Sequence, residues 1–458
     1  NDGENPVTAL LALSISFAST FSSAKKKTMN KHTLPDTATD TAQLKLTATK
    51  SFQIIDGAKA GLLTYNDSFP GPLLEVEEGQ KVTIRFNNQL DVPSNLHLHG
   101  IFMSPEEDKP HQVVEPGESL TYTFEAHRGS AGMYWYHPHA HGSVTRQLFE
   151  GLYGPIIIRG EIDKLEPLAS ATEQVLVLHD IQLQNGKVSP HEGMDWGRGK
   201  EGDLVLVNGE RIPAMPVPTG LLRLRVLNAS TARYYHLGIP GKKLHVIGQD
   251  GSFLEKPVPM DTLLLSPGER ADILVEATGE ADLPLLNLPY SRTPAGPGKD
   301  TPAGGAVLAT FAVKGEPRTV ILPDKLSTVP ELDLATAADH KTLTFGAVMQ
   351  PLQFTINNKA FDHHRTDLTA QAGTLEVWDI VNPMMMDHPF HLHTFPFQVI
   401  SVNGEPVPYR AWKDVVNVPA NTTVRIAIPF EKYTGHVMYH CHILEHEDLG
   451  MMGNLEVV

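Results

Sequence analysis

The only cysteine in the chain, Cys441, lies between two histidines in the sequence HCHILEHEDLGM, residues 440–451. A single cysteine cannot form a disulfide within the chain, so it is either a buried apolar side chain or a metal ligand. On a strand, successive side chains point to opposite faces, which puts His440 and His442 on one face and Cys441 on the other. One short strand is therefore predicted to serve two metal sites back to back.

The site on the cysteine face needs further soft ligands. His446 and Met451 follow Cys441 at intervals of five residues, and His388 is the candidate for a second imidazole. Two histidines, a cysteine and a weak axial methionine define a blue-copper electron-transfer site. Met452 is the alternative axial ligand.

The opposite face needs a second site. The pattern His-x-His occurs three more times, which with His440 and His442 gives eight imidazoles; the other six are His97, His99, His137, His139, His391 and His393. On a strand, each pair presents two imidazoles to one side. Eight imidazoles exceed what one ion can bind, and imidazole is a good copper ligand, so the pattern indicates a cluster of several copper ions.

The four motifs HLHG, WYHPHAHG, HPFHLH and HCHILEHEDLGM resemble, in order and form, those of the multicopper oxidases, a family that includes laccases, bilirubin oxidases and bacterial cuprous oxidases. The resemblance extends from about residue 45 to the C-terminus. It implies four copper ions. One is a type 1 copper on His388, Cys441, His446 and Met451, and one is a type 2 copper on His97 and His391. The type 3 pair is implied on His99, His137 and His442 and on His139, His393 and His440.

Length and composition favour a large β protein. The 458 residues, 41% of them hydrophobic, are enough for two to four domains, and 37 glycines and 35 prolines indicate many turns. The net charge of −16 argues against nucleic acid and anionic membranes as partners. We expect a monomer that meets a small-molecule reductant and O2.

Two sequence elements recur three times in the same order. A glycine, an alternating apolar run and an asparagine appear in EEGQKVTIRFNNQL, PTGLLRLRVLNAST and QAGTLEVWDIVNPM, which equates Asn87, Asn228 and Asn382. A turn followed by alternation recurs at Pro116, Pro267 and Pro419. The repeats predict an all-β protein of three consecutive antiparallel β-sandwiches. The family resemblance implies that these are cupredoxin-like Greek-key domains.

The predicted domains are residues 45–162, 163–316 and 317–458. The first and third each carry two His-x-His motifs, whereas the second has a single histidine, His236, where a pair would be expected, so the cluster is expected between the first and third domains. His179 and His245 are expected to bind no metal. Residues 1–44 are predicted to be disordered or signal-like. The order of charges around the apolar run LLALSISFAS is atypical for an export signal, so a periplasmic or secreted location is expected with a cytoplasmic one open.

Two acidic residues are candidates for moving protons at the cluster. Glu447 follows His446, and Asp108 lies nine residues beyond His99; both resemble acidic positions of bacterial family members. The alternative for each is a solvated surface charge. After Asp108 the sequence departs from the family pattern, with Lys109 and Pro110 in place of glycines. His141 is expected to be structural or to support a ligand.

The family resemblance favours a laccase-like oxidase of phenols and aromatic amines. Cys441 is covalently connected to His440 and His442, which gives electrons a route from a one-electron site to an O2-reducing cluster. Electrons would enter through His446 or His388 if either ring reaches solvent. The alternatives are a cuprous or other metal-ion oxidase and a copper-binding electron carrier without turnover. The one methionine cluster, residues 384–386, is expected to form a packed apolar turn.

Overall fold

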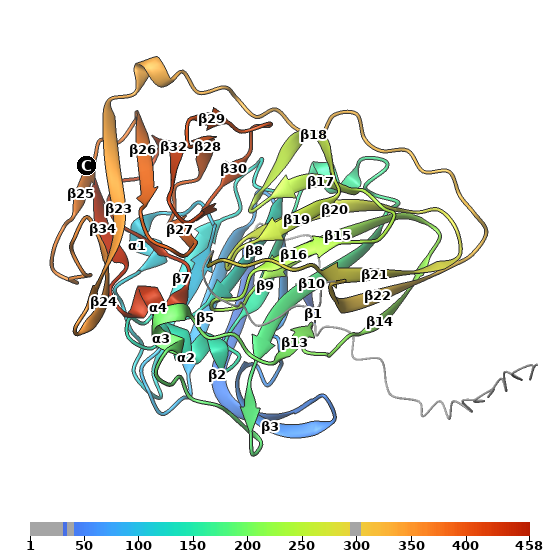
Figure 1. Ribbon diagram of the computed structural model, residues 1–458, viewed down its shortest axis with the longest axis horizontal. Coiled ribbons are helices and arrows are strands. Elements are labelled where there is room, and N and C mark those ends of the chain that lie inside the picture. The colour runs from blue at the N-terminus through green and yellow to red at the C-terminus, as the bar shows by residue number, and fades with distance from the viewer. Residues whose placement is uncertain (1–30, 34–40, 294–303) are drawn as a thin grey trace, which may run out of the picture.

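The computed structural model describes residues 31–33, 41–293 and 304–458, and nearly all of its regular structure is β (Figure 1). In these residues the strands form six sheets, which stack as three pairs around three hydrophobic cores. We call the three pairs the first, middle and third units. The prediction of three consecutive β-sandwiches is therefore confirmed. Most of the predicted signal-like segment lies outside the described residues.

The first unit has two sheets. One follows the order β1 (Lys31–Thr33), β4 (Leu73–Glu77), β9 (Gly154–Arg159), β8 (Gly132–His137) and β6 (His97–His99). The other follows the order β11 (Leu183–Gln184), β12 (Lys187–Val188), β3 (Ala58–Tyr65), β2 (Thr41–Ile55), β5 (Lys81–Asn88) and β7 (Ser119–Glu125). The β11–β12 hairpin comes from the predicted second domain but joins the sheet of the first unit through β3.

The middle unit also has two sheets. The first has the order β13 (Leu204–Val207), β10 (Thr172–Ile181), β15 (Gly220–Asn228), β20 (Arg270–Ala277), β17 (Leu244–Gln249) and β18 (Ser252–Met260). The second has the order β14 (Ala214–Pro218), β22 (Ala306–Lys314), β21 (Ala281–Asn287), β16 (Tyr235–Gly238) and β19 (Thr262–Leu265).

The third unit repeats this plan. One sheet contains β24 (Leu352–Ile356), β23 (Asp339–Met349), β26 (Thr374–Asn382), β32 (Thr422–Phe430), β28 (Phe397–Val402) and β29 (Glu405–Pro406), with β30 (Trp412–Lys413) paired to β28. The other contains β25 (Leu368–Ala370), β34 (Met452–Val457), β33 (Gly435–Cys441), β27 (His388–Leu392) and β31 (Val415–Val418).

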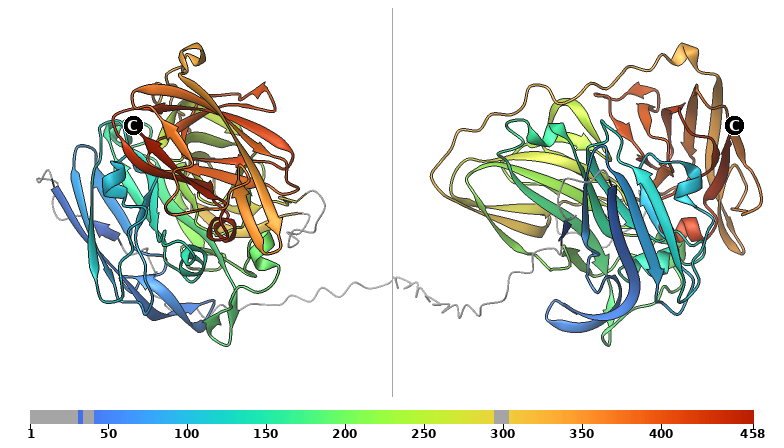
Figure 2. Two further views of the ribbon diagram at one scale, coloured as in Figure 1. Left: turned by 90° about the vertical axis from the view of Figure 1, so that its left-hand side faces the viewer. Right: turned by 180° about the vertical axis from the view of Figure 1, so that it is seen from behind.

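Short helices lie in the connections between strands. They are α1 (Pro105–Asp108), α2 (Val144–Phe149), α3 (Asp195–Arg198) and α4 (Leu444–Asp448), with 3₁₀ turns at η1 (Glu161–Lys164) and η2 (Leu334–Thr336). Helix α4 contacts both α2 and α3, so the three units meet around it (Figure 2). None of the helices in the described part of the chain has the length and apolar character needed to cross a membrane.

A buried asparagine ends the corresponding strand of each unit, β5, β15 or β26. Its amide donates to a carbonyl four or five residues on and to a carbonyl of a second, more distant segment, and its side-chain oxygen accepts from the backbone two residues on; the three positions are Asn88, Asn228 and Asn382. The sequence repeat was therefore identified correctly in the middle and third units. In the first unit the equivalent residue is Asn88 rather than Asn87, because only Asn88 points into the sandwich.

Asn88 and its neighbour offer a direct test of this repeat. Asn88→Ala leaves the carbonyl of Val92 without its donor and the amide of Leu90 without its acceptor inside the fold, at a cost of about 1–3 kcal/mol for each unsatisfied group. We expect a clear fall in the apparent Tm measured by calorimetry. Asn87→Ala is the matched control, since the half-buried Asn87 amide makes only long bonds of 3.3 and 3.4 Å. Equal losses for the two variants would contradict the assignment.

Candidate metal centres

The cysteine face of β33 carries a compact three-residue group, which we call the thiolate site. Cys441 Sγ lies 3.5 Å from His388 Nδ1 and 3.9 Å from His446 Nδ1, and the two imidazole nitrogens are 3.1 Å apart. Met451 is buried in the same hydrophobic core as Cys441, and its backbone bonds to Cys441 and His446. Met452, the alternative axial ligand, starts β34 and pairs with His440 instead.

Both imidazoles of the thiolate site are fully covered. His388 and His446 are each 0% exposed. The Phe354 ring stacks on His446 at 3.9 Å, and His446 Nε2 lies 3.3 Å from the carbonyl of Gly197 in α3, as a donor to it. Electron entry through His388 or His446 was expected only if one of these rings reached solvent. Neither ring does, and α3 of the neighbouring unit lies over His446.

The second group, which we call the imidazole cluster, contains all eight histidines of the His-x-His motifs. They are His97, His99, His137, His139, His391, His393, His440 and His442, and all are buried. Strands β6 and β8 of the first unit and β27 and β33 of the third unit bring them together. The predicted location between the first and third units agrees with this arrangement.

Strand parity separates the two groups. In the β27–β33 pair, Phe390 lies opposite Cys441 and His391 lies opposite His440. His388 precedes His391 by three residues, an odd number, so it points to the cysteine side of the sheet. Two adjacent strands thus each supply both groups, and the prediction that Cys441 and His440 face opposite ways is confirmed.

Three imidazoles of the cluster converge on one point. The Nε2 atoms of His139, His393 and His440 lie 3.1–3.2 Å from one another. Neutral imidazoles at this spacing turn lone pairs toward one another, which a shared cation would satisfy. The grouping matches one of the two type 3 sets implied by the family resemblance.

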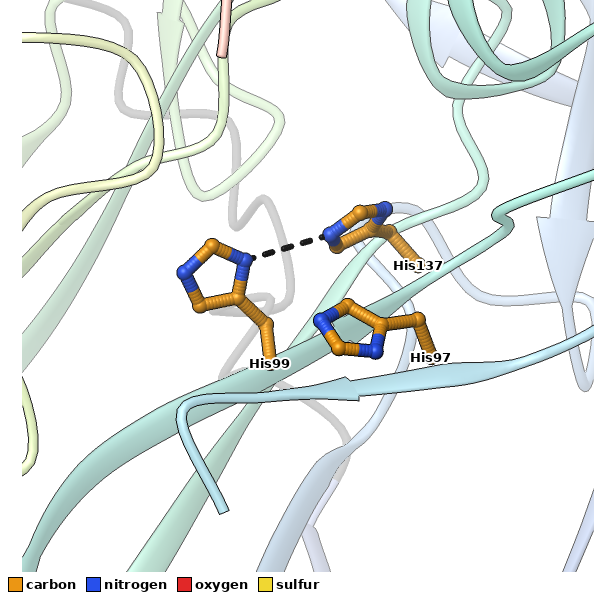
Figure 3. Close-up of side chains that lie close together, drawn as sticks. All are labelled: His97, His99 and His137. Atoms are coloured by element: carbon orange, nitrogen blue, oxygen red, sulfur yellow. Dashed lines mark hydrogen bonds between the residues drawn. The ribbon is translucent and has the colours of Figure 1, made fainter. Parts of the chain in front are cut away.

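The other imidazoles form a continuous array without a sharp division. His97, His99 and His137 form one close group, in which His99 Nδ1 lies 3.4 Å from His137 Nε2 (Figure 3). His97 also groups with His391 and His393. His442 packs beside His99 with ring centroids 5.0 Å apart. The division of these residues between a type 2 ion and a second type 3 ion remains a prediction.

Asp108 is buried between two histidines rather than solvated. Ser104 caps α1 by accepting from the Glu106 amide, and this one-turn helix ends at Asp108. The two carboxylate oxygens of Asp108 lie 3.0 Å from His97 Nδ1 and 2.9 Å from His393 Nδ1. Acceptance of both N–H groups turns the two Nε2 atoms toward the cluster.

Glu447 is also buried beside the cluster. Its carboxylate lies 3.3 Å from His440 Nδ1 and 3.5 Å from His139 Nε2, and neither oxygen has a hydrogen-bond partner in the described structure. Burial raises the pKa of Glu447 well above its ordinary value. Burial therefore favours the protonated form of this carboxyl group.

The sequence analysis missed a third carboxylate, Asp414. Its Oδ1 lies 2.9 Å from His99 Nε2, and its backbone carbonyl accepts from His391 Nδ1 at 2.7 Å. No spacing signal pointed to it, because Asp414 follows the short strand β30 and reaches the cluster only through the tertiary fold.

The buried imidazoles fit a bound metal. His97 Nε2, His391 Nε2 and both nitrogens of His442 are buried without a hydrogen-bond partner in the described structure. Such groups cost about 1–3 kcal/mol each unless something else binds them. Burial keeps the rings in the neutral form that coordinates metals, lowering the pKa of His97 and His388 to about 3 and of His393 to about 4.

The other histidines considered in the sequence analysis are held by other contacts. His236 Nε2 lies 2.9 Å from Thr262 Oγ1, His179 Nδ1 donates to the carbonyl of Ala229, and His245 lies 3.4 Å from Glu276. His141 is exposed and packs on Phe361. Of the three methionines before Asp387, Met386 is buried and Met384 half-buried, but Met385 is 58% exposed, so the turn is only partly packed.

The low pKa values predict acid sensitivity of the copper-free protein. Below about pH 6.5 histidines of the unfolded chain bind protons, while the buried His97 and His393 remain neutral until about pH 3 and about pH 4. Their contribution to stability is therefore complete above pH 6.5 and is lost as the pH falls. We expect the apparent Tm of the copper-free protein to drop between about pH 6.5 and 5, above the range where ordinary carboxylates titrate. A constant Tm across this window would contradict neutral buried imidazoles.

Models of known families match most of the chain. Three models, each described as multicopper oxidase, match residues 47–162, 182–284 and 328–458. The multicopper oxidase mco of Staphylococcus haemolyticus is 31% identical over 409 residues, covering 86% of this chain and 83% of the relative. A laccase of Bacillus subtilis is 27% identical over 472 residues, covering 86% and 89%.

Solved structures agree with these relationships. A multicopper oxidase from Campylobacter jejuni, described as a metallo-oxidase, superposes with a TM-score of 0.86 at 33% identity over 94% of both chains. A laccase-like multicopper oxidase, CueO, from Ochrobactrum superposes with a TM-score of 0.83 at 28% identity, covering 94% of this chain and 100% of the other. The three sandwiches are cupredoxin-like, and the chain belongs to the multicopper oxidase family of copper-dependent oxidoreductases.

Proposed function

We propose that this protein removes single electrons from a small-molecule reductant and passes four of them to O2, with water as the product. The observation that carries this proposal is the alternation of side chains at the end of β33, where Cys441 lies in the thiolate site and its two neighbours lie in the imidazole cluster. An electron carrier would need only the thiolate site. Eight buried imidazoles beside it support an oxidase.

The proposed ligands follow the two groups. His388, Cys441, His446 and Met451 would hold the type 1 copper, and the eight histidines of the imidazole cluster would hold the type 2 ion and the type 3 pair. Copper, when bound, supplies one-electron chemistry at the thiolate site and O2 reduction at the cluster. The third unit thus contributes to both sites, and the first unit only to the cluster.

The protein's own groups supply electron connection and protons. One peptide unit joins Cys441 to His440 and another joins it to His442, so no mobile carrier is needed between the sites. Reduction of O2 to water consumes protons, and Glu447 and Asp108 lie against imidazoles on the cluster side of α4 and α1. We propose Glu447 as a proton donor and Asp108 as a proton donor or electrostatic partner.

We propose phenols and aromatic amines as reductants, as in the laccases that this chain resembles. One observation favours a second candidate, a metal-ion oxidase. His388 and His446 are both covered, which limits direct contact with a bulky aromatic substrate, and Met385 is exposed close to His388 in the sequence. The Campylobacter jejuni relative, described as a metallo-oxidase, supports the same alternative.

The domain division at residues 45–162, 163–316 and 317–458 and a periplasmic or secreted location are further parts of the proposal. The three sheet pairs and the three matched segments support the division. The copper requirement supports a compartment outside the cytoplasm.

The proposed activity can be measured with the copper-loaded protein. We expect four copper ions per chain, a blue charge-transfer band and O2 uptake that depends on the reductant. A phenol and Cu(I), tested separately, distinguish the two reductant classes. One copper ion per chain without O2 uptake would contradict the oxidase and indicate an electron carrier.

Glu447→Gln tests the proton-donor role. The amide keeps the shape of the side chain but cannot release a proton, so we expect O2 consumption to slow by about 10²-fold, within the usual range for general acids, while the blue band stays intact. Glu431→Gln, on the exposed surface, is the control and should retain full turnover. Unchanged turnover in Glu447→Gln would remove this residue from the mechanism.

A further inference from the structure

The middle unit supplies no histidine to the imidazole cluster, yet the turn between β19 and β20 reaches it. Gly268 in this turn has φ +86°, and a Cβ there would lie 3.0 Å from ring atoms of His442. Two residues later, Arg270 begins β20 and is 0% exposed. A fully buried guanidinium in this position needs a structural reason, because burying an unpaired charge is costly.

Arg270 binds all three units. Its Nη1 and Nη2 donate to the two oxygens of Asp414 at 2.6 and 2.7 Å, a bidentate pair with the third unit. Its Nε donates to the carbonyl of Met133 on β8 of the first unit at 3.2 Å, and Nη1 also donates to Gly268 of its own turn. One side chain therefore fixes the middle unit against both units that carry the cluster.

The Asp414 carboxylate passes this constraint to the cluster. Its Oδ1, which accepts from Arg270, also lies 2.9 Å from His99 Nε2. The His99 ring stacks on His391 at 3.8 Å between centroids, and His391 Nδ1 donates to the Asp414 carbonyl. A carboxylate that holds one nitrogen of His99 fixes both the ring orientation and the tautomer, which leaves the other nitrogen free to coordinate.

The surroundings leave little freedom to this arrangement. Gly100 follows His99 with φ +85°, and a Cβ there would meet Arg270 Nη2 and come within 2.6 Å of Asp414 Oδ2. The backbone amide of Asp414 donates to the buried Asp250 at 3.0 Å, and Asp250 pairs in turn with Lys413 at 3.3 Å. The carboxylate is held from the backbone side as well as by the guanidinium.

We propose that Arg270 is a positioning residue of the O2-reducing site: acting through Asp414, it sets the orientation of His99, so that the middle unit completes a copper cluster to which it contributes no ligand. This inference rests on the proposed copper cluster. It assigns the middle unit a direct part in the chemistry of the site, beyond spacing the other two units.

The test compares copper-loaded Arg270→Gln and Arg270→Lys with the unsubstituted protein. Arg270→Gln loses the bidentate pair, so we expect the cluster to bind less copper or its type 3 pair, which is EPR-silent while coupled, to become EPR-visible. We expect O2 uptake to fall by about 10- to 100-fold. The blue band of the thiolate site should persist, because Arg270 contacts none of its residues. Arg270→Lys keeps the charge and should recover part of the lost copper and turnover.

Arg223→Gln is the matched control. Arg223 is also buried in the middle unit and forms a bidentate pair with Asp272, but its carboxylate partners, Asp272 and Asp163, bond to no histidine of the cluster, whereas Asp414 bonds to His99. It should lower the Tm and leave copper content and the EPR spectrum unchanged. Cluster changes of equal size in Arg223→Gln, or an unchanged copper content together with an unchanged EPR spectrum in Arg270→Gln, would overturn the proposal.

A second variant, Asp414→Asn, tests the proposal if Arg270→Gln fails to fold. Asp414→Asn preserves the shape of the link but weakens its hold on His99, and it should produce the same cluster-specific changes; an unchanged cluster would again overturn the proposal. Failure of the proposed function is recognised separately, because the unsubstituted protein would then bind one copper ion and show no O2 uptake.

Discussion

A β-strand turns successive side chains to opposite faces, and the chemistry of this protein depends on that constraint in β33. Cys441 points into the core of the third unit, where His388 and His446 lie close to it and Met451 is buried in the same core. His440 points to the interface with the first unit, where it lies beside His139. The two centres are therefore separated by one strand thickness and joined by a peptide bond, which provides close electronic contact without shared ligands.

Burial determines the chemical state of the side chains at both centres. Desolvation holds the imidazoles in their neutral, coordinating form and raises the pKa of the Cys441 thiol, so a bound cation is what makes the thiolate favourable there. Carboxylates at the rim of the cluster, Asp108 and Asp414, accept N–H groups on the outer sides of the rings. They point the remaining nitrogens inward, toward the position of the metal.

The three units repeat one topology but divide its uses. β6, β16 and β27 occupy the same place in their sheets, yet His97 and His99 on β6 and His388 and His391 on β27 face the centres, whereas His236 on β16 bonds to Thr262. The middle unit instead buries charge. Arg223 and Arg225 lie two residues apart on β15, on the same face of the strand, and both pair with Asp163 of η1. Alternation alone would place this face in solvent, but in the structure it packs against η1.

The sequence by itself determined the three β units, the candidate ligands and the two-sided strand, because alternation and the His-x-His spacing are local properties that a strand turns directly into geometry. It also identified the candidates Asp108 and Glu447. Only the tertiary structure decided that Asp108 joins two histidines, that α3 covers His446, and that Asp414 and Arg270 reach His99. These contacts link residues up to 315 positions apart, and no local pattern records which loops meet when three sandwiches pack together.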